Sequence, residues 1–156
     1  MTASDLALLK ASHRKQLALC AELEEIADNL PDHVNRQRCL HLARSLCPII
    51  MEAHALEECA LFSKVHALAH TLPNLDITIE RLRWEHFEDL CFSEELREAL
   101  LDLGRADRPI NGEALGYMLR GFFESLRRHV AFEQEMLMPL LDLAKSDATR
   151  NGPGEH

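Results

Sequence analysis

The sequence is poor in basic and aromatic side chains. Its 156 residues carry 17 Lys and Arg against 26 Asp and Glu, a net charge of −9, and include one Trp and one Tyr. Nucleic-acid-binding modules need a basic patch for the phosphate backbone, and many also stack bases on aromatic rings. Because the chain has neither a basic tract nor interleaved aromatics, we expect no nucleic-acid partner.

Cysteine occurs without the spacing of a metal or disulfide motif. The five cysteines are Cys20, Cys39, Cys47, Cys59 and Cys91. Their number is odd and no two form a Cys-x-x-Cys pair, which indicates free thiols in a reducing compartment. An uninterrupted apolar run of about 18 residues is also missing, so we expect no membrane span. With no secretory signal either, the expected location is the cytoplasm.

Glycine and proline, six of each, fall in clusters that leave four long segments between them. β-Branched residues are scarce outside Ile77-Thr78-Ile79, which disfavours strands. Within the segments apolar residues recur every three or four positions, as in amphipathic helices. We predict an all-α, up-down-up-down four-helix bundle over residues 1–145, followed by a flexible tail at 146–156. The expected helices cover roughly 4–30, 32–70, 75–103 and 111–145.

Residues that favour helix starts precede the later helices. The second helix would begin at Asp32, the third at Asn74 or Asp76, and the fourth at Asn111 or Gly112. Pro48 lies inside the second segment. It would either kink that helix or begin its long regular part.

Single histidines and His-x-x-x-Glu pairs alternate twice along the chain. In order they are His13, His54-x-x-x-Glu58, His86 and His129-x-x-x-Glu133. The single histidine precedes its pair by 41 residues in the first half and by 43 residues in the second. Residues four apart lie on one face of a helix. Each pair is therefore expected to direct its imidazole and its carboxylate the same way.

Helix lengths place the two histidines of each hairpin at similar depths. From His86 to Gly104, and from Asn111 to His129, the chain runs 18 residues, or about 27 Å of helix. The first hairpin has a mismatch of about 7 Å, which a partly non-helical start to the second helix would absorb. We expect all four histidines in one layer, with the two glutamates one turn along on diagonal helices.

Imidazoles and carboxylates in one layer favour a dinuclear metal centre. Imidazole binds zinc, copper, nickel or iron, and a carboxylate with two oxygens can bridge two ions. Without metal, glutamates among apolar side chains would lose solvation free energy unless they were protonated or paired. The alternative for any one of these residues is an ordinary solvated or partly buried polar side chain.

Four stretches of the chain resemble the hemerythrin-like, or HHE cation-binding, domain family, over about residues 5–145. The stretches are Ser12–Leu17, Glu52–Phe62, Arg83–His86 and His129–Pro139. The resemblance implies two non-haem iron ions bridged by carboxylates, although imidazole and carboxylate also accept zinc or manganese. The implied terminal ligands are His13, His54, His86 and His129, and the implied bridges are Glu58 and Glu133.

One ligand of the oxygen-carrying members is missing. Their third helix has His-x-x-x-His, whereas the residues four before and four after His86 are Leu82 and Leu90. The chain is more similar to four-histidine members that repair iron centres or respond to nitric oxide. Those members also tend to have a glutamate before the third-helix histidine, as Glu85 is here. Glu85 is therefore expected to support the centre from outside the ligand set.

Other polar residues near the layer are not expected among the ligands. Glu57 points about 100° away from Glu58 around the helix, which indicates a solvated side chain or a partner of a ligand. Cys59 and Cys91 are expected to be small buried residues.

The resemblance implies a protein that reacts with or senses dioxygen, peroxide or nitric oxide, or that donates iron to damaged iron centres. The alternative is a module in which metal occupancy changes contact with a protein partner, without turnover. Oxidase or peroxidase activity is left open, and so is the oligomeric state, a homodimer included.

Overall fold

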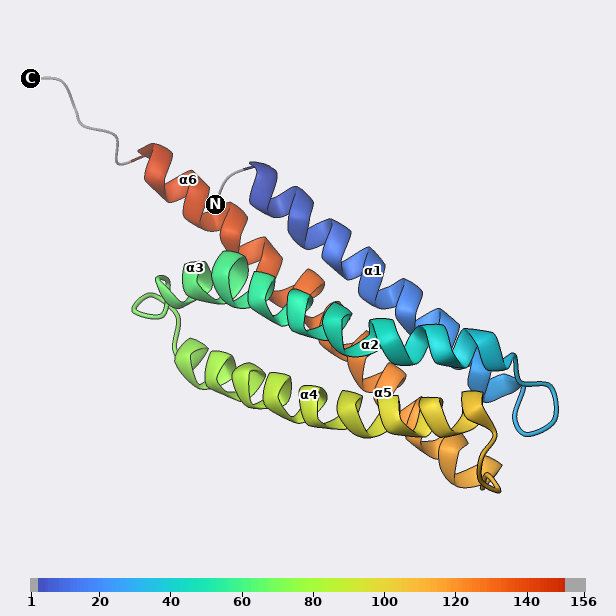
Figure 1. Cartoon of the computed structure of the whole chain (residues 1–156). Helices are drawn as coiled ribbons and strands as arrows, with labels where there is room; N and C mark the ends of the chain where they lie inside the picture. The colour runs from blue at the N-terminus through green and yellow to red at the C-terminus, as the bar shows by residue number, and fades with distance from the viewer. Residues whose placement is uncertain (1–2, 151–156) are drawn as a thin grey trace, which may run out of the picture.

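The computed structural model describes residues 3–150, where four long helical rods joined by short loops form an up-down-up-down bundle (Figure 1). The elements are α1 (Ala3–Asp28), α2 (Arg36–Glu57), π-helix η1 (Glu58–Phe62), α3 (Ser63–His66), α4 (Leu75–Arg105), α5 (Gly112–Phe132), π-helix η2 (Glu133–Leu137) and α6 (Met138–Arg150). The second rod comprises α2, η1 and α3, and the fourth comprises α5, η2 and α6. No strand occurs in the described residues. The predicted all-α four-helix bundle is confirmed.

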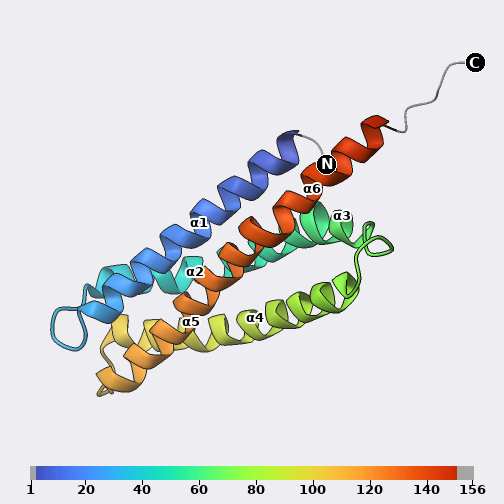
Figure 2. The same cartoon turned by 180° about the vertical axis from the view of Figure 1, so that it is seen from behind.

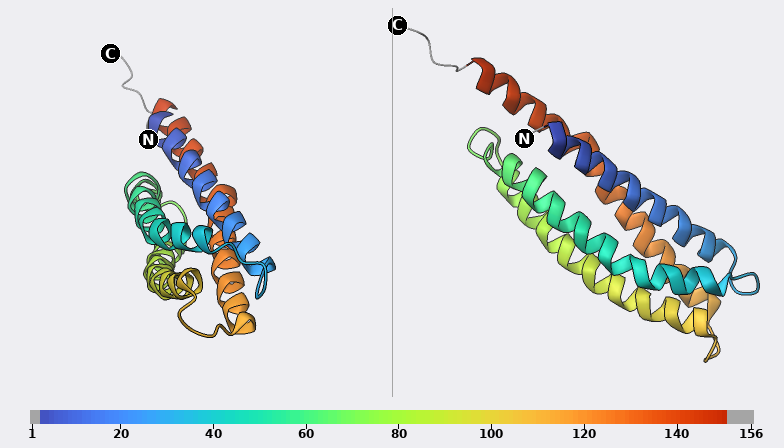
Figure 3. Two further views of the ribbon diagram at one scale, coloured as in Figure 1. Left: turned by 45° about the vertical axis from the view of Figure 1, so that its right-hand side comes forward. Right: turned by 45° about the horizontal axis from the view of Figure 1, so that its top comes forward.

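The rods are arranged as two close pairs. α1 runs beside α5, and α2 runs beside α4, as the front and back views both show (Figures 1 and 2). When the bundle is tilted so that its top comes forward, α1 and the fourth rod lie along one side and α2 and α4 along the other (Figure 3, right). Each rod therefore contributes one face to a shared interior.

Side-chain caps begin two of the helices. Asn35 accepts a hydrogen bond from the Arg38 backbone N–H at 3.1 Å, and Asn111 accepts one from that of Ala114, also at 3.1 Å. The predicted start at Asp32 is therefore corrected to Arg36, because Asn35 is the residue that caps the free N–H groups. The stretch before Arg36 is non-helical, as the depth of the histidines requires. Pro48 lies inside α2 and does not end it.

The last helix is longer than the sequence predicts. α6 continues to Arg150, past the domain boundary expected at residue 145. The rest of the predicted tail, residues 151–156, lies outside the described residues. Among the described helices, none is both long and apolar enough to cross a membrane.

A polar layer divides the interior into two apolar clusters. The larger cluster includes Leu23, Leu46, Leu100 and Phe122, toward the α1–α2 and α4–α5 loops. The smaller cluster includes Leu9, Phe62, Ile79 and Leu137, toward the opposite end. The buried polar side chains between them are His13, Gln16, Glu57, His86, His129 and Glu133. Polar groups held between two dry clusters are shielded from bulk water, which strengthens every electrostatic contact among them.

Candidate metal centre

Six side chains from all four rods converge in the polar layer. They are His13 of α1, His54 and Glu57 of α2, His86 of α4, His129 of α5 and Glu133 of η2. Glu57 Oε2 lies 2.8 Å from His86 Nε2 and 3.3 Å from His129 Nε2. Glu133 Oε1 lies 3.2 Å from His13 Nε2 and 3.3 Å from His129 Nε2. Two carboxylates and four imidazoles thus form one continuous cluster.

Stacking fixes the orientation of the histidine rings. His54 stacks on His86, with ring centroids 3.9 Å apart and planes inclined by 11°. Phe62 stacks on His86 as well, with centroids 5.0 Å apart. The Nε2 atoms of His86 and His129 are 3.3 Å apart. Packing therefore directs these imidazole nitrogens toward one another, which is the preorganisation that a ligand site needs.

Two groups of three metal-ligand side chains share one carboxylate. The first group is His54, Glu57 and His86, and the second is His13, Glu57 and Glu133. Within each group the ligand atoms lie within 4.8 Å of one another. His129 joins the groups, because its Nε2 is 3.3 Å from both Glu57 Oε2 and Glu133 Oε1. Glu57 is thus the one carboxylate that both groups contain.

The structure does not bring Glu58, the expected bridge, into this cluster. Its side chain is 44% exposed and pairs with Arg83, whose Nε and Nη2 lie 2.8 Å and 2.7 Å from Glu58 Oε1. Glu57, expected outside the ligand set, is wholly buried and contacts His86 and His129. The third and fourth residues after His54 lie about 60° and 40° to either side of it around a helix, so spacing alone does not choose between them.

In the structure Glu57 and Glu133 occupy equivalent positions in their rods. Glu57 stands four residues before Leu61, and Glu133 stands four residues before Leu137. Both leucines are buried. Glu57 is therefore the structural counterpart of Glu133, since both glutamates are buried about one turn before these leucines. The two π-helices begin at or just after these carboxylates, and π-helical turns are frequent at functional sites.

No sequence pattern singled out Gln16, yet it belongs to the same layer. Its side chain is buried on α1, close to one turn after His13. Its Nε2 donates to Glu57 Oε1 at 3.2 Å and to Ser12 Oγ at 3.3 Å. A glutamine within an amphipathic helix carries no signal of its own, so only the contact across the bundle reveals it.

The pKa values of the two buried carboxyl groups shift in opposite directions. Burial alone would raise the pKa of Glu57, but hydrogen bonds from His129 and His86 hold that pKa well below its usual value. Burial raises the pKa of Glu133, and it outweighs the hydrogen bonds from His129 and His13. The pKa of Glu57 is thus lowered and that of Glu133 raised, although both carboxyl groups are buried.

The histidines also divide into two kinds. Burial disfavours the charged form of His129, but the Glu133 and Glu57 carboxylates raise its pKa to about 11. Burial and the neighbouring His86 lower the pKa of His54 to about 3. His54 is thus neutral at physiological pH and free to donate a lone pair, whereas His129 must give up a proton before it can bind a cation.

The side chains of the layer fit a bound cation. Within the described part of the chain, His54 Nε2 and Glu133 Oε2 are buried without a hydrogen-bond partner. Such an atom costs about 1–3 kcal/mol, and both residues belong to the ligand groups described above. Imidazole nitrogens and carboxylate oxygens together suit iron, zinc or manganese. The layer is therefore a candidate metal centre rather than an ordinary polar core.

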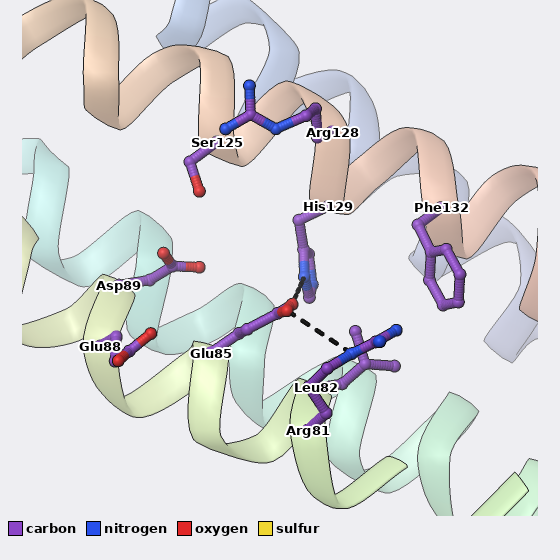
Figure 4. A pocket seen from close by; sticks show the side chains of 9 residues that line it. All are labelled: Arg81, Leu82, Glu85, Glu88, Asp89, Ser125, Arg128, His129 and Phe132. Carbon is purple, nitrogen blue, oxygen red and sulfur yellow. Dashed lines mark ion pairs between the residues drawn. The ribbon is translucent and has the colours of Figure 1, made fainter. Parts of the chain in front are cut away.

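A cavity of about 410 Å³ lies beside the layer, between α4 and α5 (Figure 4). Glu85 lies at its wall, with Oε2 3.9 Å from His129 Nδ1 and Oε1 3.8 Å from Arg81 Nε. Asp89 lines the same cavity, and burial raises its pKa to about 6. Glu85 therefore lies next to His129 but outside both ligand groups.

None of the five cysteines contributes a sulfur atom to the polar layer. Cys20 and Cys39 are buried, and burial raises the pKa of each thiol to about 11. Cys59 and Cys91, predicted to be buried, are exposed. Both lie on the outer faces of their helices, a placement that depends on how neighbouring rods pack.

One comparison with known proteins bears on the site. The family model of the hemerythrin HHE cation-binding domain matches residues 4–141. No curated protein and no solved structure matches the chain. The matched range spans all four rods and includes all six residues that converge in the polar layer.

Proposed function

Because the chain belongs to the hemerythrin HHE cation-binding domain family, we propose that its polar layer holds two non-haem iron ions. The observation that carries this proposal is the presence of Glu57 in both ligand groups. His54 and His86 would hold one ion and His13 and Glu133 the other, with Glu57 shared between them. His129 lies within reach of both groups.

The identity of the metal rests on the family and on the donor set together. Four imidazoles and two carboxylates bind iron well, but zinc and manganese accept the same donors. The family supports cation binding. We propose that the bound cations are two iron ions.

We infer that the metal centre reacts with or senses a small molecule, which is dioxygen, peroxide or nitric oxide. The residues one turn to either side of His86 are Leu82 and Leu90, so α4 offers a single nitrogen ligand. These leucines are apolar and bind no metal, so a coordination position beside His86 would stay open for a small exogenous molecule. Bound iron would supply Lewis-acid and redox chemistry there. The chain itself would orient the ligands and exclude bulk water with its two apolar clusters.

Glu85 would support the centre from outside. A carboxylate beside the outer nitrogen of a ligand histidine orients the ring and fixes its tautomer. Glu85 Oε2, 3.9 Å from His129 Nδ1, stands on that side of the ring (Figure 4). The cavity along Glu85 and Asp89 would also be the route by which a releasable iron ion leaves for a damaged iron centre.

A metal-dependent interaction module is the second function, and one observation favours it. Ile77, Trp84 and Phe87 are 69%, 60% and 58% exposed on one face of α4. The rings of Trp84 and Phe87 lie 5.6 Å apart. Exposed apolar clusters of this kind mark contact surfaces. Because α4 also carries His86, metal binding would be linked to the helix that presents this surface.

Metal analysis tests the proposal. Protein purified from iron-supplemented cells should contain close to two irons per chain and absorb in the near ultraviolet. A folded chain that holds no stoichiometric metal and is insensitive to chelator would overturn it. Loaded protein that consumes peroxide or dioxygen would be an enzyme. Loaded protein without turnover, but with metal-dependent binding of a partner at Trp84 and Phe87, would be an interaction module.

A further inference from the structure

We propose that Gln16 is a positioning residue of the metal centre, which anchors Glu57 so that one carboxylate oxygen faces His86 and His129. This inference rests on the proposed function, since it assigns a role toward the same centre. Gln16 lies within the matched range of residues 4–141, but that match assigns it no role, and neither ligand group includes it.

Gln16 is unusual among the buried polar side chains. Among the buried polar residues that the structure describes, all except Gln16 and Ser93 are histidines or glutamates of the polar layer. Ser93 hydrogen-bonds the Leu90 carbonyl and lies 3.5 Å from Cys47 Sγ, away from the layer. Gln16, only 1% exposed, instead directs its amide at Glu57. Burying an amide costs solvation free energy unless the amide is hydrogen-bonded. The group to which the Gln16 amide donates therefore indicates its role.

The two oxygens of Glu57 have different partners. Oε1 accepts the hydrogen bond from Gln16 Nε2 at 3.2 Å, whereas Oε2 lies 2.8 Å from His86 Nε2 and 3.3 Å from His129 Nε2. The last torsion of a glutamate side chain is broad and poorly restrained by itself. A donor held on one oxygen therefore selects which oxygen faces the histidines.

The chemistry of the contact fixes the orientation of the amide. An ionised carboxylate only accepts hydrogen bonds, so Gln16 must present its NH₂ group, because a flipped amide would set two oxygens against each other. Ser12 Oγ, 3.3 Å from the same nitrogen, holds the amide from the α1 side. Gln16 Oε1 is left buried and, among the described residues, without a partner.

An uncharged donor suits this position better than a charged one. Lys or Arg would hold Glu57 as firmly, but its positive charge would repel a cation bound nearby. The Gln16 amide orients the carboxylate and leaves its negative charge available. Glutamine thus provides the positioning without weakening the attraction for the metal.

The Gln16→Met variant tests the inference, since methionine has a similar volume and no N–H group. Ser93→Ala is the matched control, because it also removes a buried polar group, about 10 Å along α4 from His86. The measurements are the Co²⁺ dissociation constant, by competition with a chromophoric chelator, and the visible spectrum of the Co²⁺-loaded protein. Thermal unfolding of the metal-free variants reports on folding.

Gln16→Met is expected to bind Co²⁺ 10–100-fold more weakly, the usual loss for a partner of a metal ligand, and to show an altered spectrum. Ser93→Ala should match wild type in both. A structural role for Gln16 would lower the melting temperature and leave the spectrum unchanged. If Gln16→Met does not fold, Gln16→Asn, which keeps the amide but shortens its reach, should show the same weakening.

Wild-type affinity and an unaltered spectrum in a folded Gln16→Met or Gln16→Asn variant would overturn the inference alone. Wild-type protein that binds no metal would overturn the proposed function, and this inference with it. The two failures are therefore distinguishable.

Discussion

Glu57 and Glu58 are adjacent in the chain, yet the carboxylate of Glu57 lies among the histidines and that of Glu58 pairs with Arg83 at the surface. Glu57 is wholly buried, whereas 44% of the Glu58 side chain is exposed. A buried ionised carboxylate needs a compensating positive charge, and in the metal-free protein His129 supplies it. A bound cation would take over that role.

Substitution of each glutamate separately tests this arrangement. Glu57→Gln should lose most of the bound metal, because the shared carboxylate is removed. Glu58→Gln should retain it and change the free energy of unfolding by less than about 1 kcal/mol, as expected for a partly exposed ion pair. Metal per chain and thermal unfolding are the measurements. Equal metal loss in both variants would contradict the assignment.

Phe62 should matter to the metal centre and not only to the core. It is fully buried and stacks on His86, so Phe62→Leu should lower both stability, by about 1–2 kcal/mol, and metal affinity. Phe122, equally buried in the larger cluster, provides the control. Phe122→Leu should lose similar stability while its metal affinity stays at the wild-type value. Titration with Co²⁺ and chemical denaturation would show whether the two effects separate.

Asp89 should make the stability of the metal-free protein depend on pH. Burial raises its pKa to about 6, against about 3.9 in an unfolded chain. Between these values the folded protein holds a proton that the unfolded chain lacks. The contribution of Asp89 to stability is thus present below about pH 4 and is lost as the pH rises through about 6.

The Asp89→Asn variant removes this titration. Its stability relative to wild type should increase as the pH rises from about 4 to about 7. Urea unfolding of both metal-free proteins across this range isolates the difference from other titrating groups. Parallel curves for the two proteins would show that Asp89 does not titrate as expected.

Gly104 marks a close approach between α4 and α2. A Cβ at this position would lie 2.7 Å from the Leu40 side chain and 3.1 Å from the Arg36 carbonyl oxygen. Gly104→Ala should therefore cost about 1–3 kcal/mol, although alanine is the better helix former. At Gly116 the nearest atom to a Cβ would be 3.9 Å away. Gly116→Ala should be neutral or stabilising by up to about 1 kcal/mol, and thermal unfolding compares the two.

The exposed aromatic pair on α4 should be dispensable for folding. Trp84→Ser is expected to change the free energy of unfolding by less than about 1 kcal/mol and to leave metal content unchanged, because the side chain is 60% exposed. Binding of a partner, if the chain acts as an interaction module, should fall sharply in the same variant. Loss of metal from Trp84→Ser would instead link this surface to the centre itself.

Much of the architecture could be predicted from the chain alone. Apolar residues at helical spacing, interrupted at clustered Gly and Pro, predict four rods, and counting residues from the loops predicts that four histidines meet at one depth. Helix boundaries were less predictable, since Asn35 rather than Asp32 caps α2. Capping depends on which side chain reaches the free N–H groups, and several residues near a helix start are capable of it.

By itself the sequence determined the periodic pattern, the depth of the histidines and the family resemblance, because these depend on distances along one chain. Only the tertiary structure decided between Glu57 and Glu58 and brought Gln16 to the Glu57 carboxylate. Residues three and four after His54 lie at similar angles on either side of it, so the choice depends on what α4 and α1 place opposite them. Arg83 on α4 draws one carboxylate outward, and the Gln16 amide on α1 and the histidines hold the other inside.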